Sequence, residues 1–202
     1  MQYFVPKNLV VFEEEIKKSR FITYLHHTNG MDEAKQFWMW VRMQHPQACH
    51  HCWATVAESP TNSQGLGFSD DGEPAGTAGK PMLACLQGSN IGEITAVVVR
   101  YFGGVLLGTG GLVRAYSNGV QQALKQVETV LKVERKPYQL VCDYAQINLV
   151  QNLCKQYDVL IETQDFQADV TFTLAISADK LVGFQQALSD SSSGQLCLES
   201  KE

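Results

Sequence analysis

The chain has 202 residues, of which 45% are hydrophobic and 18% charged, proportions typical of a soluble protein with one large or two small domains. The most apolar segment carries Arg100 and is too short to span a membrane. The first twenty residues lack the pattern of a secretory signal peptide. We therefore expect a cytoplasmic protein without membrane contact. Its six cysteines are expected to be reduced thiols, mostly buried, rather than a disulfide framework.

The net charge of −5 is unevenly distributed along the chain. Residues 1–136 carry thirteen Lys and Arg against twelve Asp and Glu, whereas residues 137–202 carry three against nine. An acidic domain repels a phosphate backbone. Any contact with nucleic acid is therefore predicted for the N-terminal part of the chain.

Hydrophobic periodicity predicts alternating strands and helices in the first two thirds of the chain. A run of β-branched residues at 93–102 is typical of a strand that is buried on both faces. Pro81 is placed in the first turn of a short helix, where a missing N–H has no cost. In chain order we predict strand 20–27, helix 31–45, strand 49–58, a long glycine-rich loop, helix 81–89, strand 93–102 and helix 110–128.

A charged run that meets Pro137 predicts a domain boundary, with domains at 1–135 and 136–202. The second domain shows a β-α-β-β-α-β pattern, which is typical of ferredoxin-like domains. Ser177 is expected to cap its second helix. The predicted fold class is therefore α+β. In chain order the second-domain elements are strand 138–144, helix 145–157, strands 159–164 and 168–176, helix 177–192 and strand 194–200.

The loop GFSDDGEPAGTAGKP at residues 67–81 resembles a phosphate-binding Walker A loop only superficially. Pro74 stands where that motif needs glycine, and Pro81 stands where it needs Ser or Thr. The preceding element is also a polar loop instead of a strand. Nucleotide hydrolysis of the Walker type is therefore excluded. Thr77 is a candidate cap for the helix that follows.

Three carboxylates in the same loop allow two interpretations. Asp70, Asp71 and Glu73 could hold a divalent metal or act as a general acid and base. The Asp-Gly and Glu-Pro pairs also suit an ordinary surface turn, and this second interpretation is favoured.

The segment Cys49-His50-His51-Cys52 has metal-ligand chemistry, but a zinc site needs a second ligand pair at a distance, and the sequence offers none. In a strand, His50 and Cys52 share one face while His51 points to the other, so the four cannot converge on one ion. We predict no metal here. The favoured interpretation is one buried face and one exposed histidine, with a Cys–His nucleophile pair as the alternative.

A second glycine-rich segment, RYFGGVLLGTGGLVRAY, joins the buried strand to a helix. Glycines allow backbone N–H groups to converge, and a helix N-terminus favours an anion. Arg114 in the first turn is a poor partner for the helix dipole, which indicates a negative ligand. Close strand–helix packing with solvated arginines explains the same residues equally well.

Four blocks of the chain lie within residues 17–118, namely KKSRFITYL, HHCWA, SDDGEPAGTAGKP and GEITAVVVRYFGGVLLGTGGLVRAY. Together they resemble the signature of the bacterial YigZ proteins, relatives of the eukaryotic IMPACT protein. The resemblance implies an N-terminal domain like domain 2 of ribosomal protein S5 and a ferredoxin-like C-terminal domain. No cofactor and no settled reaction are implied.

The family resemblance also implies a role near translation. Eukaryotic IMPACT restrains the starvation kinase of translation initiation by competing for the kinase's activator on ribosomes, and bacterial members are proposed to act on translation or to bind nucleic acid. The eukaryotic proteins carry an extra N-terminal domain that this sequence lacks, so kinase regulation does not transfer directly.

Three hypotheses follow, and the first is favoured over an enzyme. The first is a translation-associated protein that binds RNA or the ribosome through its N-terminal domain. The second is a hydrolase or phosphoryl-transfer enzyme that uses His50, Asp70, Asp71 and Glu73. The third is a module whose acidic C-terminal domain binds a protein partner. The predicted anion-binding residues are Arg20, Lys80, Arg100, Gly103, Gly104, Gly110, Gly111 and Arg114.

Overall fold

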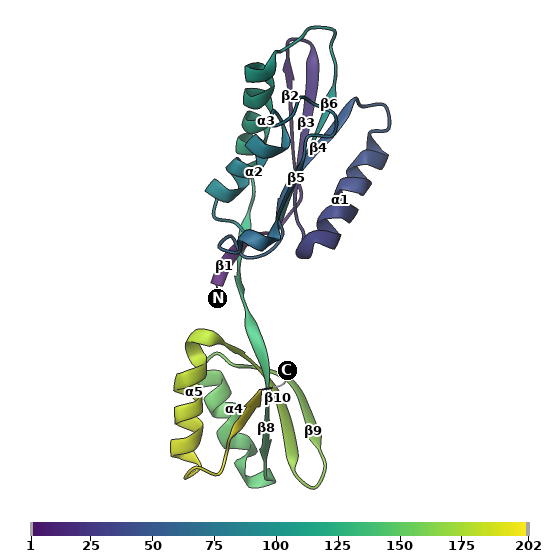
Figure 1. The fold of residues 1–202 in the computed structure, drawn as a ribbon. Helices are drawn as coiled ribbons and strands as arrows, with labels where there is room; N and C mark the ends of the chain where they lie inside the picture. The colour runs from purple at the N-terminus through teal and green to yellow at the C-terminus, as the bar shows by residue number, and fades with distance from the viewer. Residues whose placement is uncertain (1, 201–202) are drawn as a thin grey trace. The chain divides into compact units, whose positions relative to one another are not determined.

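A computed structural model describes residues 2–200 of the chain. The described residues divide into an N-terminal unit, residues 3–132, and a C-terminal unit, residues 133–200, with which Gln2 is grouped. Both units combine helices with sheets, so the predicted α+β class is confirmed (Figure 1). The predicted boundary at 135–136 stays a prediction. Among residues 2–200 no helix combines the length and the apolar character that a membrane crossing requires.

The N-terminal unit is built on a five-stranded antiparallel sheet in the order β2-β3-β6-β4-β5. Helices α2 and α3 cover one face of this sheet and α1 covers the other (Figure 1). The bounds are β2 Val10–Ile16, β3 Ser19–His27, α1 Gly30–Gln44, β4 His50–Val56, β5 Leu66–Ser69, α2 Gly79–Gly88, β6 Ile94–Tyr101 and α3 Thr109–Leu124.

The central strand β6 is buried on both faces, as its β-branched run predicts. Val98 belongs to the core beneath α2 and α3, whereas Val97 and Val99 pack against the α1 side. Burying a side chain of this size stabilises the fold by about 1.5–3 kcal/mol relative to leaving it in water. The strand therefore fixes the position of its last residues, Arg100 and Tyr101, with little freedom.

Four strands were not predicted from the sequence, and the predicted cap of α2 is wrong. The missed strands are β1 Gln2–Pro6, β2, β5 and β7 Thr129–Val133, of which β1 and β7 pair in a separate two-stranded sheet. Thr77 does not cap α2, because its hydroxyl donates to the Pro74 carbonyl at 2.7 Å. The cap residue is Ala78, whose N–H is bound by Asp70.

The C-terminal unit has one four-stranded antiparallel sheet in the order β11-β8-β10-β9, and its core packs two helices on that sheet. Ser177 is the cap residue of α5 by position, but its side chain makes no capping hydrogen bond. Pro137 lies within β8. The bounds are β8 Arg135–Cys142, α4 Ile147–Gln156, β9 Leu160–Phe166, β10 Val170–Ser177, α5 Ala178–Ser191 and β11 Leu198–Ser200.

Candidate functional site

Arg100, at the end of β6, forms a buried ion pair instead of facing solvent. The residue is 5% exposed, and its guanidinium donates to Glu73 Oε1 at 2.7 Å. The guanidinium also lies 5.5 Å from the ring centroids of both Phe21 and Phe102. The prediction that Arg100 binds an external anion is therefore corrected, because its charge is already matched inside the protein.

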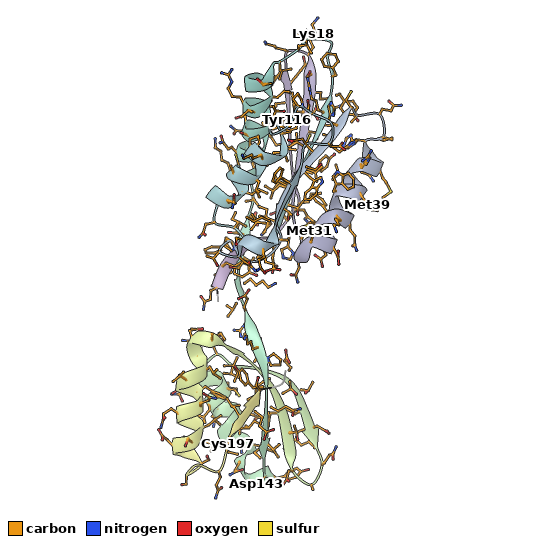
Figure 2. All side chains as sticks on the ribbon, in the orientation of Figure 1. Lys18, Met31, Met39, Tyr116, Asp143 and Cys197 are labelled. Atoms are coloured by element: carbon orange, nitrogen blue, oxygen red, sulfur yellow. The ribbon has the colours of Figure 1, made fainter. Side chains whose placement is uncertain are left out.

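Glu73 connects the loop between β5 and α2 to helix α3. The Tyr116 hydroxyl donates to Glu73 Oε1 at 2.7 Å, and the Cys52 thiol donates to the Tyr116 oxygen at 3.4 Å. Burial raises the pKa of both Cys52 and Tyr116. The thiol and the phenol therefore stay neutral at physiological pH. Tyr116 lies inside the N-terminal unit (Figure 2), and its role was not predicted from the sequence.

The Asp70 carboxylate holds the N-terminus of α2. It accepts hydrogen bonds from the N–H groups of Gly76 at 2.8 Å, Ala78 at 3.0 Å and Gly79 at 2.8 Å. Burial alone would raise the pKa of Asp70, but these three donors outweigh burial and lower it. Asp70 is thus a structural anion that closes the loop, which leaves few of its lone pairs for chemistry.

Asp71 and His50 form the rim of the same loop. The Asp71 carboxylate accepts from the backbone N–H of His51 at 2.7 Å, and the Asp71 carbonyl is 2.8 Å from His50 Nδ1. His50 Nε2 lies 3.9 Å from Glu73 Oε2, a separation that one water can bridge. The structure therefore brings His50 and Glu73 together, while Asp70 and Asp71 bind backbone groups.

The Cys49–Cys52 segment does not converge on a metal. His51 is 4% exposed, and its Nε2 lies 2.9 Å from the His45 carbonyl, while Cys52 is in the core on the opposite face. The expectation of one exposed histidine is wrong, since the His50 side chain is only 23% exposed. Within residues 2–200 no group of three or more His, Cys, Asp or Glu could hold a metal ion.

Among the six cysteines, all of them free thiols, three are buried. Those three are Cys52, Cys142 and Cys154. Cys49 and Cys197 are exposed, and Cys85 is partly exposed. The expectation of mostly buried thiols therefore holds for half of them.

The glycine-rich loop after β6 lies against the turn between β2 and β3. A Cβ atom at Gly103 would lie 1.9 Å from the Lys18 carbonyl oxygen, so only glycine allows this approach. Gly104 and Gly108 have φ values of +84° and +74°, the left-handed region that favours glycine. Gly110, by contrast, has open space around it. The loop therefore fixes the β2–β3 turn next to the start of α3.

Lys17 and Arg114 line one surface groove of about 620 Å³, together with Leu107 and Gly111. Arg114 is exposed, and its Nε donates to the Gly110 carbonyl at 3.1 Å. Lys17 was not predicted as a binding residue from the sequence. The available signal was a pair of lysines directly before a predicted strand.

The two remaining predicted cations lie elsewhere on the surface. Arg20 donates to the Glu13 carboxylate through two nitrogens, at 2.5 and 2.9 Å, so Glu13 already balances its charge. Lys80 is exposed in the first turn of α2. Neither Arg20 nor Lys80 is among the described residues that line the 620 Å³ groove.

Two family models match the chain, one in each unit. The Impact N-terminal domain matches residues 17–124, and a domain of unknown function, DUF1949, matches residues 140–195. The first match covers every block that carried the resemblance. The chain belongs to the IMPACT family.

Relatives at high identity align with nearly the whole chain. An IMPACT family member of Haemophilus influenzae is 62% identical, with 98% of this chain and 96% of that protein aligned. The IMPACT family member YigZ of Escherichia coli is 55% identical, with 97% and 96% aligned. A crystal structure described as a hypothetical protein is 54% identical, with a TM-score of 0.75, and the match covers 100% of this chain and 98% of that one.

Proposed function

We propose that this IMPACT family member is a cytoplasmic, translation-associated protein that binds RNA or the ribosome through its N-terminal unit. In this proposal the N-terminal unit is a domain like domain 2 of ribosomal protein S5, and the C-terminal unit is ferredoxin-like. The β-α-β-β-α-β order and the sheet order β11-β8-β10-β9 support the second assignment.

The strained turn at Lys17 and Lys18 carries the proposal. Ile16 pairs with Ser19, so these two lysines alone connect β2 to β3. Their φ values are +48° and +65°, the left-handed region in which a non-glycine residue costs about 1–2 kcal/mol. Two-residue hairpin turns of this kind favour Asn-Gly. Two lysines in such a position weaken the fold, which supports a role for their charges at the surface.

The surroundings of this turn suit a single-stranded nucleic acid. Lys18 projects at the end of the N-terminal unit (Figure 2), and Lys17 shares the 620 Å³ groove with Arg114. Among the described residues, none of these three cations is in a salt bridge. Nearby, the Phe102 side chain is 47% exposed. Lysine and arginine attract phosphates, and an exposed aromatic ring offers a stacking surface for a base.

The hydrolase alternative has one supporting observation, the 3.9 Å separation of His50 and Glu73. Glu73 is already bound by Arg100 and Tyr116, and its side chain is 3% exposed. A general base needs a free lone pair and access to substrate. We therefore assign these groups a structural role, in which they hold the 69–79 loop against β6 and α3.

The test is binding of a short oligouridylate to the full chain at low salt. Lys17→Glu and Arg114→Glu are each expected to weaken binding by about fivefold or more, because an attraction becomes a repulsion. Lys35→Glu is the matched control, since Lys35 is exposed on α1, outside the groove. Equal losses in all three variants, or no binding of the wild type to either RNA or ribosomes, would contradict the proposal.

A further inference from the structure

Strand β9 is an open edge of the C-terminal sheet. It lies at the end of the strand order β11-β8-β10-β9. All of its seven residues except Ile161 are exposed. An edge strand of this length offers unpaired backbone N–H and C=O groups to another extended chain. The opposite edge strand, β11, has three residues. The longer edge is therefore the one suited to docking.

The acidic groups along β9 lack cationic partners. Glu162 and Asp165 on the strand and Asp169 just after it are all exposed. Within the described part of the chain, none of the three forms a salt bridge. The edge strand β2 of the other unit also carries glutamates, but there Glu13 is bound by Arg20. Among the described residues, neither carboxylate of β9 has a cation as a partner, whereas Glu13 of β2 does.

Apolar groups stand at both ends of the same strand. Leu160 is 49% exposed at its start and Phe166 is 56% exposed at its end. The Phe166 ring lies 6.4 Å from the ring of Tyr144, itself 54% exposed, so the two form one aromatic patch. A docked strand would cover this apolar area while its cations meet the central carboxylates.

We propose that β9 is a docking edge for an extended basic segment of a partner protein, which adds to the sheet as a fifth strand. Charge selects this occupant. A second copy of the chain would place Glu162 and Asp165 close to the same carboxylates, and like charges across strands destabilise pairing. An RNA strand would meet repulsion from a segment that carries nine acidic against three basic residues over 137–202.

The experiment uses the full chain and a short synthetic peptide of alternating lysine and valine. Nuclear magnetic resonance should show perturbed amide signals at residues 160–166, and β9 amides should gain protection from hydrogen exchange. A peptide of the same sequence with alternate backbone N-methyl groups lacks the donors that a sheet needs, and it should not bind. Signal changes confined to other segments would overturn the proposal.

Charge reversal supplies the matched comparison. Glu162→Lys should weaken peptide binding by about fivefold, because a favourable surface charge becomes repulsive. Asp190→Lys makes the same change on α5, where Asp190 is exposed, and it should leave affinity within about twofold. Equal effects of the two variants would overturn the proposal, as would self-association through β9 or binding of oligouridylate at this edge.

Discussion

The Arg100 guanidinium donates to the Glu73 carboxylate at 2.7 Å, and the side chains of both residues are at most 6% exposed. This ion pair joins two glycine-rich segments that lie far apart in the sequence. It fixes the 69–79 loop on one side and the end of β6 on the other. The glycine-rich loop that contains Gly103 comes directly after β6. The position of the proposed RNA-binding surface therefore depends on this buried ion pair.

Arg100→Ala should destabilise the protein strongly. The substitution leaves Glu73 buried without its cation, a change that costs about 3–5 kcal/mol in other proteins. Urea unfolding followed by circular dichroism measures the loss. Arg42→Ala is the control, because Arg42 is exposed and 3.8 Å from Asp71, and it should cost no more than about 1 kcal/mol. Similar losses in the two variants would contradict a buried, mutually dependent pair.

Gly103→Ala should damage both stability and RNA binding. The new Cβ would meet the Lys18 carbonyl oxygen at 1.9 Å, and backbone on both sides would have to move. The free energy of unfolding is expected to fall by at least about 1–3 kcal/mol. Gly110→Ala is the matched variant, because its Cβ meets nothing within 4 Å and alanine favours helices by up to about 1 kcal/mol. Thermal unfolding of both variants checks the contrast, and an unaffected Gly103→Ala protein would refute it.

Replacing Lys17-Lys18 by Asn-Gly should stabilise the fold and weaken RNA binding. Asn and Gly adopt the left-handed conformation more readily, so relief of strain should add about 1–2 kcal/mol to the free energy of unfolding. Urea unfolding of the Asn-Gly variant measures its stability, and RNA titration of the same variant measures its affinity. A double variant with Arg at both positions keeps the charges and should keep the affinity. Loss of stability on Asn-Gly substitution would contradict the assignment of strain to this turn.

Much of the fold of the N-terminal unit could be predicted, because the spacing of apolar residues along the sequence reflects which side chains are buried. The apolar run of β6 and the helical spacing of α1 each gave the correct element. Strand β2 was missed, because a sheet edge tolerates three consecutive glutamates that look like a charged surface. Edge pairing depends on the neighbouring strand, and a local pattern contains no information about it.

The site was harder to predict, because its contacts join distant segments. Arg100 and Glu73 are 27 residues apart, and Tyr116 reaches Glu73 over 43 residues. A buried arginine needs a partner, but the sequence predicted an external anion for Arg100, because only the fold brings Glu73 next to it. Thr77 failed as a cap for the same reason, since Asp70 reaches the helix N-terminus from outside the local window.

Asp70→Asn should destabilise the protein most at neutral pH. The pKa of Asp70 is lowered in the folded state, so its carboxylate contributes stability above the unfolded pKa of about 3.9. That contribution is lost as the pH falls through the lower folded value. The difference between wild type and variant should therefore be about 1–3 kcal/mol at pH 7 and shrink below about pH 4. Urea unfolding of both proteins from about pH 7 to below about pH 4 tests this prediction. A difference in unfolding free energy that does not change with pH would contradict the role of Asp70 as an anionic cap.

The salt dependence of RNA affinity tests the central claim most directly. If Lys17, Lys18 and Arg114 each neutralise one phosphate of a single strand, a plot of log K against log salt should have a slope of about −2. Lys17→Glu should make that slope shallower, and Lys35→Glu should leave it unchanged. A slope near zero, or one that Lys17→Glu and Lys35→Glu change equally, would contradict RNA binding at this surface.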